Sequence, residues 1–311
     1  MKKQILFSLL LILGSALEAH AWGIVGHKAT ALIAEAYLTP KAKQAVKDLL
    51  DGERLVQVAN WADEVRESSE YAHTKDYHFQ NTRSPEADAS RSYKGILNTL
   101  SYRDRAHYKA GAVEAIAECE RVLRDEKSTR QEKQIALKFL VHFVGDLHQP
   151  LHTGSSRMVG GNIIRVNWDG DTTNLHKIWD SQIIADRVMQ MPRQGRRESS
   201  LSYAQWLLDT YPDKAAADTQ PSSIATWYQE SLSYLPEAYD RRYITNPRDY
   251  AEEVEVTIDQ RILAGGVRLG EMINSIFADD KGETVDPNAQ MVQYAEKIVG
   301  SLQKIICLNP K

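Results

Sequence analysis

Cysteine is nearly absent from this sequence. Its 311 residues contain two cysteines, Cys119 and Cys307, and no Cys-x-x-Cys pair. A zinc site built from thiolates is therefore not expected, because such sites need several closely spaced cysteines. The two cysteines could form a disulfide in an oxidising compartment, but the sequence does not establish whether they meet.

An excess of basic residues is also missing. The chain has 38 Lys and Arg against 42 Asp and Glu, a formal net charge of −4. Removal of residues 1–21 would take away Lys2, Lys3 and Glu18 and leave 36 basic and 41 acidic side chains, a net charge of −5. Proteins that hold duplex DNA through its phosphates are usually basic. Any attraction of this chain for phosphate must therefore be local.

The sequence has no apolar run of membrane-spanning length. The most apolar stretch begins the chain as MKKQILFSLLLILGSALEAHA, with two lysines before it and an A-x-A pattern at residues 19–21. This pattern is typical of a secretory signal peptide. We expect cleavage before Trp22, a mature chain of residues 22–311, and a secreted or periplasmic protein. A membrane anchor is the alternative, but a spanning helix needs ~20 apolar residues.

The hydrophobic pattern has mainly a helical period, with no internal repeat and no strong domain boundary. We therefore expect a mainly α fold in a single domain. Helices are expected over residues 30–50 with a bend at Pro40, 104–124, 131–147, 175–184, 222–239, 247–276 and 287–307. The helix over residues 131–147 is apolar nearly all round in its C-terminal half, which predicts a central buried helix ended by Pro150.

One segment departs from the helical period. NIIRVNW, residues 162–168, is rich in β-branched residues and is bounded by Gly160-Gly161 and Asp169-Gly170, which predicts a short strand or a β-hairpin near residues 162–170. Thr172 or Thr173 is expected to cap the helix that follows. Residues 190–202, rich in Arg and Ser, are expected to form a loop.

Two of the expected helices carry a histidine and an aspartate four residues apart. HFVGDLHQPLH contains His142 and Asp146, and NLHKIWD contains His176 and Asp180. Residues at i and i+4 share one helix face, with Cβ atoms ~5–6 Å apart. Neutral imidazole and carboxylate are the usual nitrogen and oxygen ligands of zinc. A single such pair is more often a hydrogen-bonded surface pair, but two pairs, one of them in the most apolar helix, favour a metal site.

Further candidate ligands lie outside these pairs. They are His152, just past Pro150, and the upstream residues His27, Asp63 and His78. His148 lies on another helix face from His142 and Asp146 and is expected to be structural, and His73 and His107 are expected at the surface.

Six short motifs now occur in a fixed order between residue 22 and about residue 184: WGIVGH, NWADEVR, YHF, HFVGDLHQPLH, GGN and NLHKIWD. In this combination the chain resembles the zinc-dependent single-strand-specific nucleases of fungi, plants and bacteria, often called type I nucleases, of the phospholipase C/nuclease superfamily. The resemblance implies a single helical domain of that type with three Zn²⁺ ions held by nine residues.

The resemblance also assigns the ligands. They are Asp63, His78, His142 and Asp146 for the first ion, His152, His176 and Asp180 for the second, and Trp22, His27 and Asp146 for the third. Trp22 would bind through its free amino group and its carbonyl oxygen. Only cleavage immediately before Trp22 creates that amine, which gives the signal peptide a chemical role.

The implied reaction is hydrolysis of a phosphodiester bond. Three divalent ions and three ligand aspartates would give the site a charge of about +3, which explains how an acidic protein attracts phosphate locally. Zinc lowers the pKa of a bound water towards ~7. By the resemblance Asp63 and Arg66 are the catalytic residues, with Arg66 stabilising charge on the phosphoryl oxygens. Without the resemblance, a surface salt bridge of Arg66 with Glu67 or Glu70 would be the better explanation.

Three residues are implied to contact the substrate. Phe79 would stack on a nucleobase, Asn81 stands where some members have a carboxylate that contacts the base, and Asn162 belongs to the GGN motif. Stacking is largely indifferent to base identity. The expected substrates are single-stranded DNA and RNA, giving 5′-phosphate products, with possible 3′-nucleotidase activity on nucleotides. Base preference and DNA-versus-RNA preference stay open.

Two rival functions are compatible with these ligands. A zinc-dependent phospholipase C shares the fold and the N-terminal tryptophan, and a non-catalytic zinc-binding periplasmic protein could use the same donors. Phe79, Asn81 and the absence of a long apolar loop favour the nuclease. Arg66 and an ion with only three protein ligands favour catalysis. No stable protein partner and no membrane association are expected.

Overall fold

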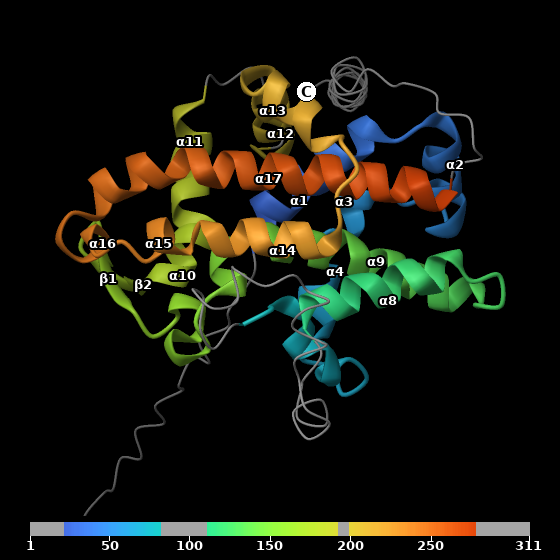
Figure 1. The fold of residues 1–311 in the computed structure, drawn as a ribbon, viewed down its shortest axis with the longest axis horizontal. Coiled ribbons are helices and arrows are strands. Elements are labelled where there is room, and N and C mark those ends of the chain that lie inside the picture. The colour runs from blue at the N-terminus through green and yellow to red at the C-terminus, as the bar shows by residue number, and fades with distance from the viewer. Residues whose placement is uncertain (1–21, 82–110, 192–198, 278–311) are drawn as a thin grey trace, which may run out of the picture.

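The computed structural model describes residues 22–81, 111–191 and 199–277 (Figure 1). The expected signal peptide, His107, the first residues of the helix expected over 104–124, and the helix expected over 287–307 with Cys307 lie outside the described residues. The described residues form one mainly helical domain with one short two-stranded antiparallel sheet, so the predicted fold class is confirmed.

The elements follow one another in a simple order. The first part of the chain forms α1 (Ile24–Tyr37), α2 (Pro40–Leu49), α3 (Leu55–Val58), α4 (Trp61–Val65) and the 3₁₀ helix η1 (Ala72–His78). The middle part forms α8 (Ala112–Arg124), α9 (Arg130–His148), η2 (Pro150–Thr153), η3 (Ser156–Gly161), β1 (Arg165–Trp168) and β2 (Asp171–Asn174). The last part forms α10 (Leu175–Lys177), η4 (Ile178–Gln182), α11 (Ile183–Gln190), α12 (Ser199–Thr210), α13 (Pro212–Asp218), α14 (Ile224–Ser233), α15 (Leu235–Ala238), α16 (Arg242–Thr245) and α17 (Pro247–Phe277).

The helix expected over residues 30–50 is in fact two helices. Thr39 caps α2 by accepting a hydrogen bond from the Ala42 N–H, and Pro40 occupies the first helical position, where its missing N–H costs nothing. Asn274 of α17 stabilises the interruption between α1 and α2. Its side chain accepts a hydrogen bond from the Thr39 N–H at 2.8 Å and donates one to the Tyr37 carbonyl at 2.8 Å. A long-range contact therefore decides a boundary that local sequence presents as a bend.

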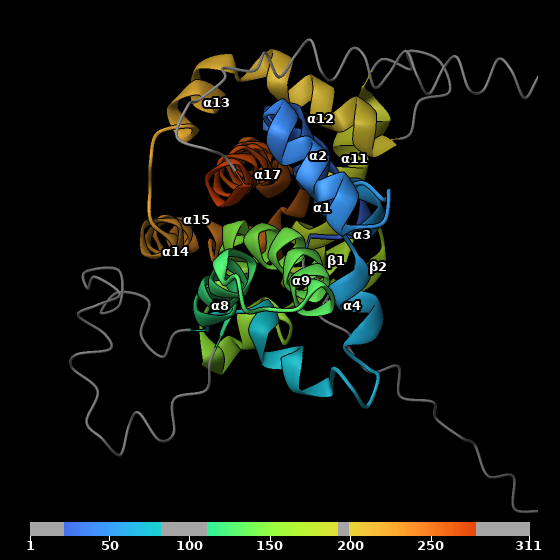
Figure 2. The same cartoon turned by 90° about the vertical axis from the view of Figure 1, so that its right-hand side faces the viewer.

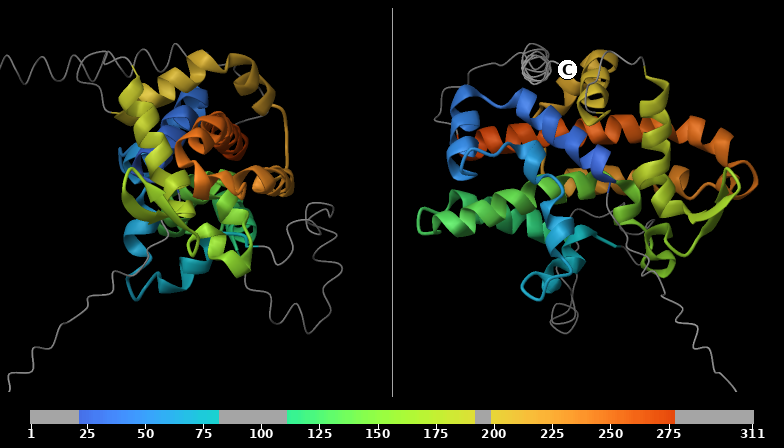
Figure 3. Two further views of the ribbon diagram at one scale, coloured as in Figure 1. Left: turned by 90° about the vertical axis from the view of Figure 1, so that its left-hand side faces the viewer. Right: turned by 180° about the vertical axis from the view of Figure 1, so that it is seen from behind.

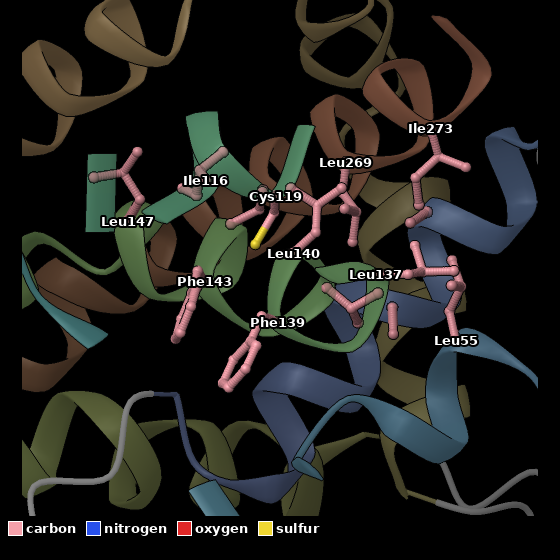
Figure 4. Packing of buried hydrophobic residues seen from close by; sticks show 14 of the residues in the cluster. Leu55, Ile116, Cys119, Leu137, Phe139, Leu140, Phe143, Leu147, Leu269 and Ile273 are labelled. Carbon is pink, nitrogen blue, oxygen red and sulfur yellow. The ribbon is translucent and has the colours of Figure 1, made fainter. Parts of the chain in front are cut away.

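Helix α9 lies at the centre of the fold, as predicted. Thr129 and Glu132 form a capping box at its start, and Pro150 ends it and opens η2. Figure 4 shows that Phe139, Leu140 and Leu147 of α9 pack among side chains from α3, α8 and α17. The two candidate ligands on this helix are thus carried by a rigid, fully packed element.

The predicted hairpin forms, with shifted bounds. β1 and β2 pair antiparallel, with Arg165 opposite Asn174 and Trp168 opposite Asp171. Thr172 and Thr173 lie within β2, so neither caps the next helix. Asn174 does so instead, by accepting from the Lys177 N–H at 2.8 Å. The prediction of the cap was wrong because the strand continues through both threonines.

Other boundaries also differ from the expectation. The helix expected over residues 175–184 is interrupted by η4, a π turn, and continues to the end of α11. The loop expected over residues 190–202 is wrong at both ends, since Gln190 belongs to α11 and α12 begins at Ser199, and residues 192–198 lie outside the described residues. The segment expected as one helix over residues 222–239 is α14 and α15, whereas α17 matches the helix expected over 247–276 within one residue.

Two hydrophobic clusters form the core. The first contains residues of α1, the hairpin, α11, α12 and α17. The second contains residues of α1, α2, α3, α8, α9, α14 and α17. Helices α1 and α17 lie side by side and contribute to both (Figures 2 and 3). Leu147 belongs to the second cluster and Leu151 to the first. The junction of α9 and η2 therefore lies where the two clusters meet.

A buried carboxylate on α17 gives a prediction about pH. Asp259 accepts hydrogen bonds from Tyr203 Oη at 2.5 Å and from Arg187 Nη2 at 2.8 Å. Burial, opposed by these partners, raises the pKa of Asp259 to about 6. Its contribution to stability is therefore fully present below the unfolded pKa and is lost as pH rises through about 6.

We expect the stability of the unaltered protein, relative to Asp259→Asn, to fall by about 2 kcal/mol from about pH 4 to about pH 7. Denaturant unfolding of both proteins at several pH values measures this difference. A constant difference across that range would contradict the raised pKa.

Among the described residues, no helix is both long and apolar enough to span a bilayer.

Candidate metal centre

The carboxylate of Asp146 is the centre of a cluster of histidines from four elements. Its Oδ2 lies 3.1 Å from His78 Nδ1 and 3.4 Å from His142 Nε2. Its Oδ1 lies 3.4 Å from His27 Nε2 and 3.9 Å from His152 Nδ1. Asp146 is completely buried, and α9 places it one turn after His142 on the same face. A carboxylate with donors on both oxygens is suited to bridging two cations.

Asp63 completes the first group. Its Oδ1 lies 3.6 Å from His78 Nδ1 and 3.6 Å from His142 Nε2. Asp63 comes from the short helix α4 and His78 from the end of η1, so neither shares an element with α9. Donor atoms of His78, His142 and Asp146 lie within 4.8 Å of one another, as do those of His27, Asp63 and His142. These spacings allow one cation to contact several donors at once.

A separate group forms at the other side of the α9–η2 junction. His176 Nε2 lies 3.2 Å from Asp180 Oδ2 and 3.1 Å from His152 Nε2, and all three residues are buried. Asp180 lies in the π turn η4, a rare backbone form that is often found at functional sites. The structure thus brings together the second set of three residues that the sequence analysis named.

Trp22 and His27 approach the cluster at the start of α1. Both are buried, and both lie against Gly145: a Cβ there would be 3.0 Å from His27 Nδ1 and 3.7 Å from Trp22 Cδ1. The His27 ring stacks on that of His142, with centroids 3.8 Å apart. The Gly23 N–H donates to the Asp180 carbonyl at 2.6 Å, which ties this end of the chain to the second group.

Backbone carbonyls orient three of the imidazole rings. Nδ1 of His142, His152 and His176 donates to the carbonyl oxygens of Ala59, His78 and Gly160 at 2.8, 2.6 and 2.7 Å, respectively. In the neutral form of a ring that donates from Nδ1, Nε2 carries no proton and can act as a metal donor.

Burial and charge in this cluster fit divalent cations. Burial and the neighbouring His142 lower the pKa of His27 well below its usual value. Burial lowers the pKa of His176 to about 4, so both imidazoles are neutral. Burial raises the pKa of Asp146 and of Asp180, so their ionised forms need a cation. Both ring nitrogens of His27, Nε2 of His142 and Oδ1 of Asp146 are buried without a hydrogen-bond partner. A cluster of unsatisfied nitrogen and oxygen donors is chemically suited to zinc.

Arg66 lies at the edge of the first group. Its Nη1 is 3.2 Å from Asp63 Oδ1, whereas its Nε is 3.9 Å from Glu67. The side chain is buried, so a simple surface salt bridge with Glu67 does not describe it. Its guanidinium is positively charged at all working pH values.

The three expected substrate contacts lie on segments that touch the ligands. Phe79 and Asn81 follow His78 and are partly exposed, and the Gln80 N–H between them donates to the His152 carbonyl at 2.8 Å. Asn162 is partly exposed and its side-chain amide donates to the Val159 carbonyl at 3.0 Å. All three side chains are therefore partly exposed and lie on segments that adjoin the donor groups.

Gln149 is a residue that the sequence analysis missed. It is completely buried, and its amide donates to Asp180 Oδ1 at 2.7 Å while its Oε1 accepts from the Leu151 N–H at 2.6 Å. It thereby orients a carboxylate 31 residues away. Its only signal in the sequence is its position directly before Pro150, inside the motif richest in candidate ligands.

A strained turn supports His176. Val159 and Gly160 have φ values of +49° and +58°, a left-handed conformation that is unfavourable for a β-branched side chain. This turn presents the Gly160 carbonyl to His176, and a Cβ at Gly160 would lie 2.6 Å from the Leu151 carbonyl and 3.3 Å from His176 Nδ1. Strain of this kind persists only where the surroundings enforce it.

The remaining histidines behave as expected where the structure describes them. His148 is buried away from the cluster, where Nδ1 donates to the Val144 carbonyl and Nε2 accepts from Arg268 at 3.1 Å. Burial, together with the nearby Arg261 and Arg268, lowers the pKa of His148, so it is a neutral structural residue. His73 is exposed.

Comparison with known proteins gives one consistent result. A family model described as S1/P1 Nuclease matches residues 22–278. Nuclease S1 of Aspergillus oryzae is 32% identical over 213 residues, which cover 67% of this chain and 67% of that protein. Endonuclease 5 of Arabidopsis thaliana is 28% identical over 84% of this chain and 92% of its own length. Nuclease P1 of Penicillium citrinum is 26% identical over 83% of this chain and 99% of its own length.

Proposed function

Because the chain belongs to the S1/P1 nuclease family, and is therefore a phosphodiester hydrolase that acts on nucleic acid, we propose that it is a zinc-dependent endonuclease for single strands. Its substrates would be single-stranded DNA and RNA, and its products would carry 5′-phosphates. The observation that carries the proposal is the convergence of seven buried His and Asp residues on two adjoining donor groups, with Asp146 at the centre.

The proposed ligand assignment is the one that the family resemblance implies. Asp63, His78, His142 and Asp146 would hold the first Zn²⁺, and His152, His176 and Asp180 the second. The third would be held by His27, Asp146 and the amino group and carbonyl oxygen of Trp22. The short distance from His27 Nε2 to Asp146 Oδ1 and the burial of Trp22 beside His27 support this third site. Bound zinc would supply a nucleophilic hydroxide at neutral pH and neutralise charge on the phosphate.

The residues of the chain have separable tasks in this reaction. Arg66, held by Asp63 Oδ1 at 3.2 Å, would stabilise the charge that develops on the phosphoryl oxygens. Gln149 would keep Asp180 in a fixed orientation through its 2.7 Å hydrogen bond. Phe79 would stack on an unpaired base, and Asn81 and Asn162 would also contact the substrate. A base inside a duplex is not free to stack in this way, so single strands should be preferred.

Maturation is part of the proposal. We propose that residues 1–21 are a signal peptide, that cleavage occurs before Trp22 and that the protein is exported. The match of the family model begins at residue 22, which supports this site of cleavage. Removal of 3′-phosphates from nucleotides is proposed as a second activity of the same centre. The names of the three relatives, each a nuclease or endonuclease, favour this function over a phospholipase C or a non-catalytic zinc protein.

The test uses mature protein that begins at Trp22. We expect it to release 5′-phosphorylated products from single-stranded DNA and RNA, to lose this activity with a chelator and to recover it with added zinc. Metal analysis should give about three zinc ions per chain. Duplex DNA and phosphatidylcholine serve as comparison substrates. Protein that holds three zinc ions and cleaves no nucleic acid would overturn the proposal, and hydrolysis of phosphatidylcholine would favour the phospholipase.

A further inference from the structure

Three exposed cations lie on the segments that surround His176. They are Arg157 in η3, Arg165 in β1 and Lys177 in α10. Within the described parts of the chain, none of their side chains forms an ion pair or a hydrogen bond. Two exposed arginines near this end of the molecule are paired instead, Arg242 with Asp240 and Glu253, and Arg248 with Asp169 and Asp186. Arg157, Arg165 and Lys177, which have no such partner among the described residues, are therefore available to bind an anion.

Backbone contacts place these cations beside the second donor group. The Gly160 carbonyl accepts from His176 Nδ1, and the Ile164 carbonyl accepts from the Leu175 N–H at 3.0 Å. Arg157 precedes Gly160 by three residues, Arg165 directly follows Ile164, and Lys177 directly follows His176. The cations therefore lie outside the ligands, on the solvent side of the same segments.

The register of the hairpin separates positive from negative charge. Arg165 and Asn167 are exposed and share one face of β1, whereas Val166 and Trp168 are buried on the other. Asp171 is the register partner of Trp168, so it belongs to the face of Trp168 rather than to that of Arg165. Arg248, which lies 4.3 Å from the Trp168 ring, holds Asp169 on that second face as well.

Apolar side chains are exposed between the cations. Met158 is 42% exposed and Ile163 is 58% exposed. In the adjoining strand β1, exposed and buried side chains alternate regularly. Proteins that bind single strands use a positively charged surface that follows the backbone. Met158 and Ile163 would add apolar surface that the unpaired bases could cover.

We propose that the surface formed by Arg157, Met158, Ile163, Arg165 and Lys177, here called the hairpin face, binds the phosphodiester backbone of a single strand beyond the bond that is cleaved. The inference rests on the proposed function and extends it from one nucleotide at the metal centre to a longer substrate. Its occupant is fixed by charge, since the face is cationic in an otherwise acidic protein, and by its continuity with the His152–His176–Asp180 group.

The test compares two triple variants with the same change in charge. One is Arg157→Gln, Arg165→Gln and Lys177→Gln on the hairpin face. The matched control is Lys47→Gln, Lys127→Gln and Lys133→Gln. These residues lie on α2, in the α8–α9 turn and near the start of α9, at the end of the molecule away from the hairpin (Figure 1). Each is assayed on a single-stranded oligonucleotide of about 20 nucleotides, which can span the face, and on a dinucleotide, which cannot.

We expect the hairpin-face variant to lower kcat/KM for the oligonucleotide about tenfold at low salt, mainly through KM. The slope of log kcat/KM against log salt should fall by about 2, because three phosphate contacts are lost. For the hairpin-face variant, kcat/KM for the dinucleotide should change by less than about twofold. The control variant should leave kcat/KM unchanged for both substrates. An equal loss on both substrates, an equal loss in the control, or no loss would overturn the inference.

Two further measurements distinguish failure of this inference from misfolding of the variant and from failure of the proposed function. Arg165→Gln alone removes one exposed side chain. If this variant has the melting temperature of the unaltered protein and a smaller loss of kcat/KM than the triple variant, confined to the oligonucleotide, misfolding is not the cause. Binding of a phosphorothioate oligonucleotide that resists hydrolysis is followed by fluorescence anisotropy. If the unaltered protein binds it and the hairpin-face variant does not, the inference holds even where cleavage is absent and the proposed function has failed. Equal binding by both would overturn the inference even where cleavage is present.

Discussion

Asp146→Asn is expected to lower kcat/KM for single-stranded DNA by about 10³-fold or more and to reduce bound zinc. The amide keeps the shape of the carboxylate but removes its charge. Each oxygen of Asp146 faces histidines of a different subset, His78 and His142 on one side and His27 and His152 on the other. One substitution therefore weakens two of the proposed ion sites. Zinc content and steady-state rates of the purified variant measure the effect.

The matched control for this change is Asp259→Asn. Asp259 is also a buried aspartate with side-chain hydrogen bonds, but it lies on α17 with Tyr203 and Arg187. We expect this variant to keep its zinc and its rate at neutral pH. Asp146→Asn protein with full zinc content and an unchanged rate would show that the carboxylate neither bridges ions nor serves catalysis.

An extra alanine left before Trp22 is expected to remove about one zinc ion per chain and to lower activity on the order of 10²-fold. The extension converts the terminal amine of Trp22 into an amide, which is a poor metal donor. The residue has no room to move aside, because it is buried and the adjoining Gly23 N–H donates to the Asp180 carbonyl. Zinc analysis and rates on the extended and the mature protein test this effect.

Trp22→Phe in the mature protein separates the amine from the indole ring. It keeps the amine and the carbonyl oxygen but loses part of a buried side chain, so lower stability with three zinc ions is expected. If the extended protein binds three zinc ions and works at the full rate, the third site does not use the amine of Trp22.

The parts of the centre that depend on helix periodicity could be predicted from the sequence. His142 with Asp146, and His176 with Asp180, lie four residues apart, and local geometry alone brings each pair to one face. Asp63, by contrast, reaches the first group from another helix. Only the packing of α4 against α9 creates that contact. The sequence therefore offered Asp63 as a candidate ligand, and only the resemblance to a known family assigned it to the first ion.

The missed features share a physical cause. Asn274 separates α1 from α2, and Gln149 orients Asp180, through hydrogen bonds to residues that are remote in the sequence. Asn174 took the capping position because strand pairing extends through Thr172 and Thr173. Local propensity contains no information on such partners. The left-handed turn at Val159 was likewise hidden, since valine rarely adopts that conformation.

The geometry around Asp146 also has a consequence for chain entropy. Donors on α1, α4, η1, α9 and η2 meet there, so each bound ion would act as a cross-link between distant parts of the chain. A link between His27 and Asp146 closes a loop of about 120 residues, and a covalent bridge of that span removes about 5 kcal/mol of unfolded-state entropy in the simplest model. In a chain with only two cysteines, metal coordination bonds would serve the structural role that disulfides have in other proteins.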